Sequence, residues 1–387
     1  MKFNLPNFDR EEPRFFLPRS GEVITGPGDW MLSVGPVCMT FFGLVMVYSA
    51  SLFVAAQQGS ADSYYLVRQL AVVAASLGAL VFGMKVDPSL YRKYAKILII
   101  ATIIVMAGQT AFAPSIKGTK RWLPLPGGFM LQTSEFSRAV AIIYVARLLS
   151  DNVALGLKLS KKLLAALIPV GILAVLTYMQ RDLSGAAMIA AMVGLVLFLG
   201  GLNGKQFWGL TGGATAAGLI FALRTPYQRA RLVEFFFPSG SVSGDRYQSF
   251  QSMLGFGRGG IFGVGLGEGK QKMLFLPEPH TDFIYSIIGE EMGLIGTTAV
   301  LVAFMFLFVR SIKALKQQSD RFSFLMGSSL IASIMMFALV HMAVTTGIVP
   351  VTGLPLPFIS NGGSSLLVSL WTMGVIWNLS RRGSSFE

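Results

Sequence analysis

The residues best able to do chemistry lie in one segment that passes from glycines and lysines to a group of carboxylates. Asp282 comes directly before a long apolar run, which predicts a carboxylate at the start of a helix, where the helix dipole favours negative charge. A helix-capping carboxylate explains this position equally well. As a functional hypothesis, Asp282 is a general base, with Glu278 as a substrate-binding neighbour and His280 as a substrate-binding group that orients Asp282.

Two further carboxylates, Glu290 and Glu291, follow Asp282 along the same predicted helix. At 1.5 Å per residue they would lie about 12 Å deeper in the helix. Charged side chains inside an apolar helix are costly unless they meet a partner or a polar cavity. We therefore expect a buried ion pair with an arginine such as Arg68 or Arg138, ahead of a catalytic role.

A second polar cluster combines three cations with an indole before another apolar run. Its members are Lys117, Lys120, Arg121 and Trp122, and the run begins near Glu135. Cations beside an indole suit a ligand that is partly apolar and carries phosphate, and we count all five residues as candidate substrate-binding groups. Anchoring of Trp and Lys to lipid headgroups is the competing explanation.

Two other segments could wall a site between these clusters. Asp182 lies in a short turn, 180–184, and Arg246 lies in a long polar connection, where it could add to the cationic cluster. Residues 350–365 carry no charge, and their prolines and glycines would break any helix. Broken backbone inside a membrane is tolerated only where it is buried in protein or lines a cavity. We therefore expect this segment to dip back into the membrane and to form one wall of the site. Its candidate residues are Pro357, Ser360, Gly362, Gly363 and Ser364.

The composition determines which elements must position these residues. Hydrophobic residues make up 53% of the 387 residues, charged residues only 13%, and the mean hydropathy is +0.62. Such a chain is too apolar for a water-soluble domain, and its repeated apolar runs approach the roughly 20 residues that cross a bilayer. Backbone groups in lipid must pair within each segment, which favours helices over strands. The predicted fold class is an all-α polytopic membrane protein with about ten transmembrane helices.

The predicted spans and domains follow from these runs. The spans are residues 30–56, 65–84, 91–113, 134–149, 161–179, 185–200, 206–223, 283–311, 324–349 and 363–379. They form one transmembrane domain, 30–382, between an N-terminal tail, 1–29, and a C-terminal tail, 383–387. Alternate joints are rich in Lys and Arg, which marks the cytoplasmic side and places both tails there. The long connection 224–282, between helices 7 and 8, is then extracytoplasmic, and we expect it to be ordered.

Several other classes of site are disfavoured by composition. The net charge is +13, but the basic residues are scattered at helix ends and form no patch for nucleic acid. A single cysteine, Cys38, cannot form an internal disulfide. Two histidines and one thiol also argue against a zinc site.

The four polar segments, in this order, resemble the SEDS family (shape, elongation, division and sporulation) of bacterial membrane glycosyltransferases. The resemblance covers about residues 30–382, and its most specific parts are Leu276–Phe283 with Gly289–Glu291, and Pro350–Ser360 with Gly362–Ser365. Weaker agreement is found at Val47–Ser51 and Arg121–Pro124. The Pro-Glu-Pro-His sequence at 277–280 and the run at 124–129 look more like the division type than the elongation type.

This resemblance implies an enzyme that polymerises lipid II into glycan strands on the outer face of the bacterial cytoplasmic membrane. The implied partners are a class B penicillin-binding protein that cross-links the strands and other membrane proteins of the division septum. The family's essential aspartate falls on Asp282, its tryptophan on Trp122 and its glutamate on Glu135.

Our mechanistic hypothesis makes Asp282 the base that deprotonates the acceptor 4-hydroxyl, so that one displacement inverts an α-linked donor to a β-1,4 product. Lys117, Lys120, Arg121 and Arg246 would hold the pyrophosphate. A divalent cation, Mg²⁺ or Mn²⁺, could assist them, with its ligands left unassigned.

The chain departs from the family pattern at several positions. Arg181 and Thr133 replace turn prolines, which we expect mainly to relax local geometry. Asn361 replaces a frequent tyrosine, Arg138 a frequent lysine and His341 a common asparagine. Because Asp282 and Trp122 are retained, we still expect an active enzyme of a divergent or specialised type.

Two functions of other classes remain open at this stage. A flippase for lipid-linked precursors would also use helices with intramembrane charges, although no internal repeat supports it. A non-catalytic scaffold that recruits a cross-linking enzyme would tolerate the substitutions at Arg181 and Asn361. Glycan synthesis by purified protein, with and without Asp282, distinguishes all three functions.

Overall fold

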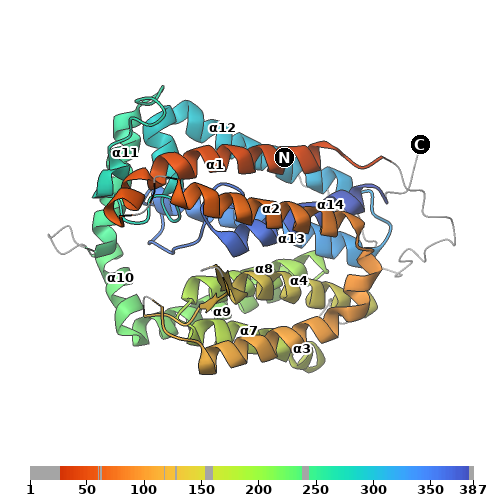
Figure 1. The fold of residues 1–387 in the computed structure, drawn as a ribbon. Helices are drawn as coiled ribbons and strands as arrows, with labels where there is room; N and C mark the ends of the chain where they lie inside the picture. The colour runs from red at the N-terminus through yellow and green to blue at the C-terminus, as the bar shows by residue number, and fades with distance from the viewer. Residues whose placement is uncertain are drawn as a thin grey trace.

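The computed structural model confirms the predicted all-α class (Figure 1). It describes residues 27–59, 61, 63–116, 118–126, 129–152, 160–237 and 244–382. The helices of this part are α1 (Met31–Gln57), α2 (Tyr64–Lys85), α3 (Pro88–Phe112), α4 (Thr133–Asp151), α6 (Lys161–Ala166), α7 (Ile168–Met179), α8 (Leu183–Leu199), α9 (Gly204–Arg224), α10 (Pro226–Phe236), α11 (Gly244–Gly259), η2 (Gln271–Phe275), α12 (Ile284–Leu315), α13 (Arg321–Thr345) and α14 (Gly363–Ser380). A two-stranded hairpin, β1 (Trp122–Pro124) and β2 (Met130–Gln132), is the small exception to the helical class.

Each predicted span coincides with a helix, although several ends differ. The fifth span is divided into α6 and α7 at Leu167, where Pro169 lies in the first turn of α7. The third begins three residues early, at Pro88, because the Asp87 side chain accepts a hydrogen bond from the Ser89 backbone N–H and proline suits a first turn. In the described residues, α1, α2, α3, α12 and α13 are the five helices long and apolar enough to cross a membrane, and α7 and α8 are shorter apolar helices.

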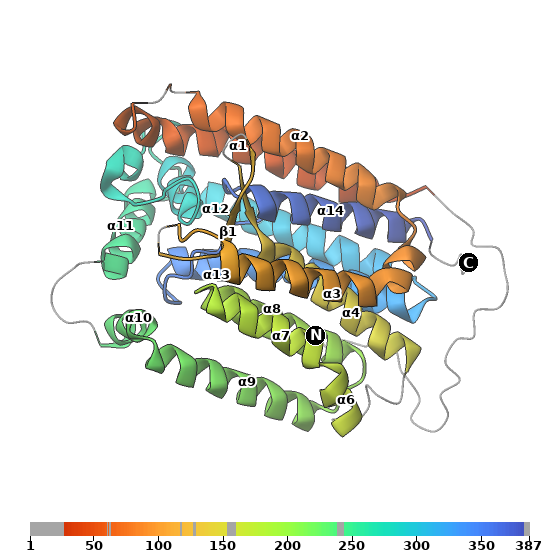
Figure 2. The same cartoon turned by 60° about the horizontal axis from the view of Figure 1, so that its bottom comes forward.

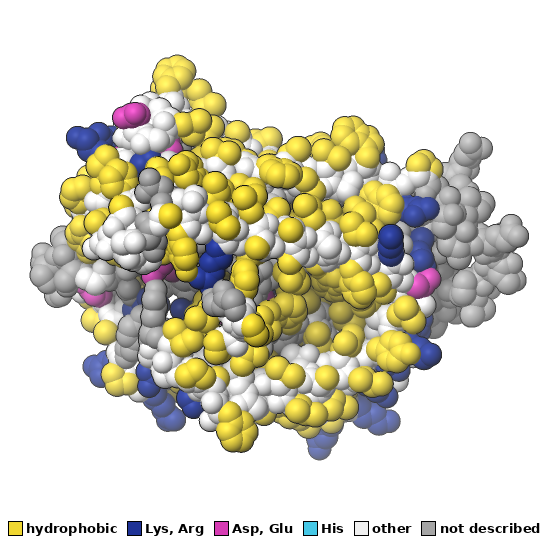
Figure 3. All heavy atoms as spheres, viewed as in Figure 1, with side chains coloured by type: hydrophobic (Ala, Val, Ile, Leu, Met, Phe, Trp, Pro, Cys, Tyr) yellow, Lys and Arg dark blue, Asp and Glu magenta, His cyan; other side chains and the backbone are white. Residues whose placement is uncertain are grey.

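The helices form two groups that meet along α13 (Figures 1 and 2). One group contains α1, α2, α12 and α14, and the other contains α3, α4, α7, α8 and α9. Helix α13 contacts α12 and α14 in the first group and α4 and α8 in the second. Hydrophobic side chains cover most of the visible face, as expected for a surface in contact with lipid (Figure 3).

Helices α2 and α14 are in close contact because glycines face each other's backbone. A Cβ atom added at Gly374 would lie 2.1 Å from the Leu80 carbonyl oxygen, and one added at Gly83 would lie 2.6 Å from the Trp371 carbonyl oxygen. Small residues at such crossings let membrane helices approach and gain van der Waals contact. The close packing of α2 against α14 therefore requires glycine at both positions.

Ion pairs bring the basic joints together at one end of the bundle. Arg382 after α14 pairs with Asp87 before α3, at 3.0 Å. Arg92 of α3 pairs with Asp151 of α4, at 2.7 Å, and approaches Asp320 before α13. Partial burial opposes ionisation of Asp87, but hydrogen bonds from Ser89 and Arg382 lower its pKa to about 2. The described chain segments at Asp87, Asp151, Asp320 and Arg382 thus share one end.

The long connection 224–282 is ordered over its described residues, as predicted. Helices α10 and α11 and the short turn η2 fill it, and α10 and α11 stand across the other end of the bundle (Figure 1). Helix α12 is broken at Gly293, which has a φ of 65°. The residues after α11 supply hydrogen-bond partners for the backbone of α12 at this break. The Gly260 carbonyl accepts from the Leu294 N–H, and the Glu290 carbonyl accepts from the Val264 N–H.

Candidate functional site

Asp282 lies at the end of the bundle away from the paired basic joints. The N-cap of α12 is Phe283, whose side chain makes no capping hydrogen bond, so Asp282 stands one residue before the cap. Asp282 thus lies just outside the helix and not at the N-cap position itself. Its half-buried carboxylate lies beside Gly353, where an added Cβ would be 3.4 Å from Asp282 Oδ2.

The backbone before Asp282 is held by the Pro- and Gly-rich segment between α13 and α14. Ser360 Oγ donates to the Thr281 carbonyl at 2.7 Å and accepts from the Leu356 N–H at 2.9 Å. The Asn361 N–H donates to the His280 carbonyl at 3.0 Å. These contacts fix the direction of the chain at the residues that carry the carboxylate.

The same segment is buried among helices, as expected for broken backbone in a membrane protein. Pro357 and Ser360 are buried, and Gly362 and Gly363 are half-buried before α14. A Cβ added at Gly43 of α1 would lie 2.7 Å from the Ile359 Cα, so α1 approaches the segment directly. These residues form a packed wall.

The hairpin and the α7–α8 turn join this wall through one hydrogen-bond network. Trp122 pairs with Gln132 across the hairpin. The Gln132 N–H donates to Ser364 Oγ at 2.8 Å, and Gln132 Nε2 donates to Asp182 Oδ2 at 3.2 Å. Ser134 Oγ also donates to Asp182 Oδ2, at 3.0 Å. The structure therefore brings together Trp122, Asp182 and Ser364, which are far apart in the sequence.

Arg231 of α10 reaches the same segment and was missed in the sequence analysis. Its Nη1 donates to the Val351 carbonyl at 3.3 Å, and Val351 is two residues before Gly353, which adjoins Asp282. The available signal was a pair of arginines, Arg229 and Arg231, in a polar connection of an otherwise apolar chain. Helix α10, which lies outside the four motifs, thus contributes a guanidinium to the segment that adjoins Asp282.

Glu290 and Glu291 are buried and form ion pairs, of which only the Glu291 pair is buried on both sides, and the predicted partners were wrong. Glu291 pairs with Lys272 at 2.6 Å, and Glu290 pairs with Arg258 at 3.3 Å. Both partners come from the long connection, and neither is Arg68 or Arg138. The two glutamates consequently fasten that connection to α12.

Glu135 also lies in a buried ion pair, with Arg138 one turn along α4. The two side chains are 3.0 Å apart, with Glu135 3% and Arg138 6% exposed. The Arg138 guanidinium lies over the Phe337 ring, 3.8 Å from its centroid. This geometry favours a packing role for Glu135 over direct contact with a ligand.

The remaining predicted binding residues occupy different surroundings. His280 is buried with its ring centroid 4.8 Å from that of Tyr65, and the exposed Glu278 supplies the carbonyl that accepts from the Asp282 N–H. Arg121 is half-buried with its guanidinium 5.9 Å from the Trp122 ring centroid. Arg246 is half-buried in the first turn of α11. Lys117 lies outside the described residues, and Lys120 is treated below.

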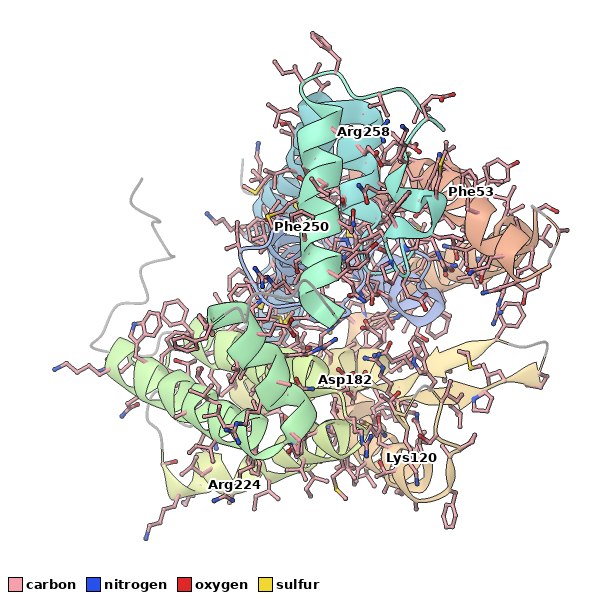
Figure 4. The ribbon with its side chains drawn as sticks, turned by 90° about the vertical axis from the view of Figure 1, so that its left-hand side faces the viewer. Phe53, Lys120, Asp182, Arg224, Phe250 and Arg258 are labelled. Atoms are coloured by element: carbon pink, nitrogen blue, oxygen red, sulfur yellow. The ribbon has the colours of Figure 1, made fainter. Side chains whose placement is uncertain are left out.

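Asp182 lies between the two groups of helices when the molecule is viewed from the α10–α11 end (Figure 4). Helix α11, with Phe250 and Arg258, lies on one side, and α9, with Arg224, lies on the other. Within the described residues no group of three His, Cys, Asp or Glu side chains could hold a metal ion. A divalent cation at this end would take most of its ligands from substrate phosphates and water, as Mg²⁺ commonly does.

Comparisons with known proteins agree on one family. The profile of the cell cycle protein family that comprises FtsW, RodA and SpoVE matches residues 30–385. A probable peptidoglycan glycosyltransferase FtsW of Trichlorobacter lovleyi is 38% identical, over 91% of this chain and 93% of the relative. The corresponding FtsW of Geobacter metallireducens is 34% identical (92% and 95%), and the stage V sporulation protein E of Bacillus subtilis is 32% identical (91% and 97%).

Solved structures support the same fold. One chain of a peptidoglycan synthase complex, described in a study of how polymerization and crosslinking are coordinated, matches with a TM-score of 0.72 and 22% identity, over 92% of this chain and 98% of that chain. RodA of Thermus thermophilus matches with a TM-score of 0.68 and 22% identity, over 93% and 98%. With matches along nearly its whole length, this polytopic membrane chain belongs to the SEDS family of FtsW, RodA and SpoVE and resembles the FtsW type more than the RodA type.

Proposed function

We propose that this protein is a peptidoglycan glycosyltransferase that polymerises lipid II into β-1,4 glycan strands during cell division. The observation that carries the proposal is the position of Asp282, a half-buried carboxylate at the end of the bundle that follows two residues held by Ser360 and Asn361. The relatives named peptidoglycan glycosyltransferase cover more than nine-tenths of the chain and support the same activity.

The reaction needs a base and a site for the leaving group. Asp282 takes the proton from the 4-hydroxyl of the acceptor GlcNAc, and the resulting oxygen attacks the anomeric carbon of the donor. The bond from that carbon to the lipid pyrophosphate breaks, and the pyrophosphate leaves with the bonding electrons. A single displacement inverts the donor from α to β.

Positive charge near Asp282 stabilises the departing pyrophosphate. Arg231, which donates to the Val351 carbonyl in the segment that adjoins Asp282, joins Arg121 and Arg246 in this proposed role. Lys117 remains a sequence-based candidate for the same role. His280 and Glu278 shape the turn that presents Asp282, since the carbonyls of both residues accept backbone hydrogen bonds there.

The cellular setting proposed for the enzyme follows from the same assignment. The Asp282 end faces outward, because the basic joints share the opposite end and positive loops favour the cytoplasm. Both termini are then cytoplasmic, in the cytoplasmic membrane at the septum. Its partners are a class B penicillin-binding protein, which cross-links the strands, and other division proteins.

Purified protein supplied with lipid II and its cross-linking partner tests this assignment. Replacing Asp282 by Asn removes the base but keeps the shape, and it should lower glycan synthesis at least about a hundredfold. Glu268→Gln is the matched control, because Glu268 is an exposed carboxylate of the same connection, and this variant should retain activity. Long glycan strands made by the Asp282→Asn protein would refute the assignment of the base.

A further inference from the structure

The turn between α7 and α8 has a geometry that proline cannot adopt. Arg181 has a φ of 63°, and its N–H donates to the Tyr178 carbonyl at 2.8 Å. The Asp182 N–H donates to the Thr177 carbonyl at 3.2 Å. This pair of bonds is a Schellman motif with Arg181 at the left-handed position after the helix. Proline lacks the N–H and has its φ fixed near −65°. With arginine in place of the family's proline, the turn therefore has a different backbone conformation, which is a larger change than the relaxed local geometry expected from the sequence.

The rebuilt turn sends its two charged side chains in opposite directions. Asp182 points inward, is 3% exposed, and accepts hydrogen bonds from Gln132 and Ser134. Arg181 is exposed, and its Nη1 donates to the Gly118 carbonyl at 2.9 Å. The acid and the base of the turn therefore do not neutralise each other.

Arg181 closes one side of a cavity of about 330 Å³ at the C-terminal ends of α3 and α7. The cavity is lined by Thr110, Ser115, Gly118, Lys120, Met179 and Arg181. This lining contains two cations and no carboxylate, together with the hydroxyl groups of Thr110 and Ser115. A cavity of this composition favours an anion that accepts several hydrogen bonds.

Both cations retain donors for a ligand. Lys120 Nζ donates to the carbonyls of Thr110 and Ala111, at 3.0 and 3.5 Å, and an ammonium group has three donors. Arg181 uses Nη1 for the Gly118 carbonyl, and a guanidinium has five donors. The carbonyl bonds hold the two side chains in place, which lowers the entropic cost of binding a ligand.

Exposed apolar side chains adjoin the cations of the cavity. Met179, in its lining, is 59% exposed, and Phe112, at the end of α3, is 89% exposed, so apolar surface adjoins the cations. We propose that this cavity binds the phosphate group of a membrane lipid. The lipid is either a bilayer phospholipid or the pyrophosphate-linked substrate, and the latter case alone depends on the proposed function.

Variants of Arg181 separate charge from backbone geometry. Asn tolerates the left-handed conformation, so Arg181→Asn keeps the turn and removes the cation. Arg181→Lys keeps a cation and is the matched control. Native mass spectrometry of purified protein with phosphatidylglycerol and with uncharged diacylglycerol measures lipid binding without any need for activity. Loss of one charge-assisted contact should weaken phosphatidylglycerol binding about fivefold for Asn and less for Lys, with diacylglycerol unaffected.

A second measurement identifies the source of the phosphate. If the substrate occupies the cavity, Arg181→Asn should raise the KM for lipid II about fivefold with little change in kcat. Weaker phosphatidylglycerol binding with an unchanged KM supports a bilayer lipid as the occupant. The proposal is overturned if Arg181→Asn alters neither phosphatidylglycerol binding nor KM while the protein remains folded. A protein inactive with lipid II would still give the binding result.

Discussion

At the scale of single residues, the buried pair of Lys272 and Glu291 explains how the long connection is fastened. Lys272 is 1% exposed, and its Nζ donates to Glu291 and to Ser49 of α1. Ser49 Oγ donates to Glu291 at 2.8 Å, which completes a closed triangle of polar groups. Asp282 lies ten residues after Lys272, so the triangle anchors the chain that carries the proposed base.

Lys272→Met should strongly destabilise the protein, because it leaves the Glu291 carboxylate buried without its cation. Removing one partner of a buried ion pair costs about 3–5 kcal/mol. The double variant Lys272→Met with Glu291→Met should recover much of this loss. Thermal unfolding in detergent, followed by circular dichroism, measures the difference.

The neighbouring pair supplies the control for that measurement. Arg258, the partner of Glu290, has a side chain that is 36% exposed, and Glu290 also accepts from the N–H groups of Lys270 and Gln271. Arg258→Met should therefore have a much smaller effect than Lys272→Met. Equal losses for the two variants would contradict the anchoring role of Lys272.

At the scale of elements, the contact of α2 with α14 depends on the absence of side chains at Gly83 and Gly374. A methyl group at Gly374 would meet the backbone of α2, which cannot move aside as a flexible side chain does. The contact positions α14, whose first residues include Ser364 of the site network. Helix spacing and site geometry are thus connected.

Gly374→Ala should force the two helices apart and lower stability by about 1–3 kcal/mol, the usual cost of overpacking. Gly78→Ala is the control, because nothing lies within 4 Å of a Cβ added at this position on α2. The midpoint of thermal unfolding should fall for the first variant and stay unchanged or rise for the second. A fall of equal size in both would show that the crossing is not the cause.

At the scale of the whole molecule, the two ends differ in how their charges are used. At one end, ion pairs join the segments near Asp87, Asp151, Asp320 and Arg382. At the other end, Arg231 contacts Val351 and Asp282 adjoins Gly353 in the segment between α13 and α14, and Lys120 and Arg181 line a cavity. Ion pairs join helix ends at the first end, whereas the second end also carries the cations that we propose bind ligands.

The proposed orientation predicts which end a membrane-impermeant maleimide can reach. After Cys38→Ser removes the single cysteine, Ser115→Cys at the Asp282 end should be labelled in spheroplasts. Ser319→Cys, in the joint before α13, should be labelled only after permeabilisation. Both serines are exposed in the structure, so access across the membrane decides the result. The reverse pattern would contradict an outward-facing Asp282.

From the sequence alone, the helix positions and the membrane class could be predicted, and Asp282 could be proposed as a site residue. Apolar length determines where a chain crosses lipid, because every backbone group there must pair within its own segment. Asp282 was identifiable because charged residues are scarce in such a chain. The sequence suggested that residues 350–365 lie beside the site, but it did not indicate the hydrogen bonds from Ser360 and Asn361 to the residues before Asp282.

Only the tertiary structure decided which charges meet. Ser49 and Glu291 are 242 residues apart, and no local pattern indicates that Lys272 joins them in place of Arg68 or Arg138. The sequence likewise did not indicate the left-handed turn at Arg181 or the hydrogen bond from Arg231 to the Val351 carbonyl. Spans follow from local hydrophobicity, whereas ion pairs and cavities depend on how helices distant in sequence pack together, and that information lies in the assembled bundle.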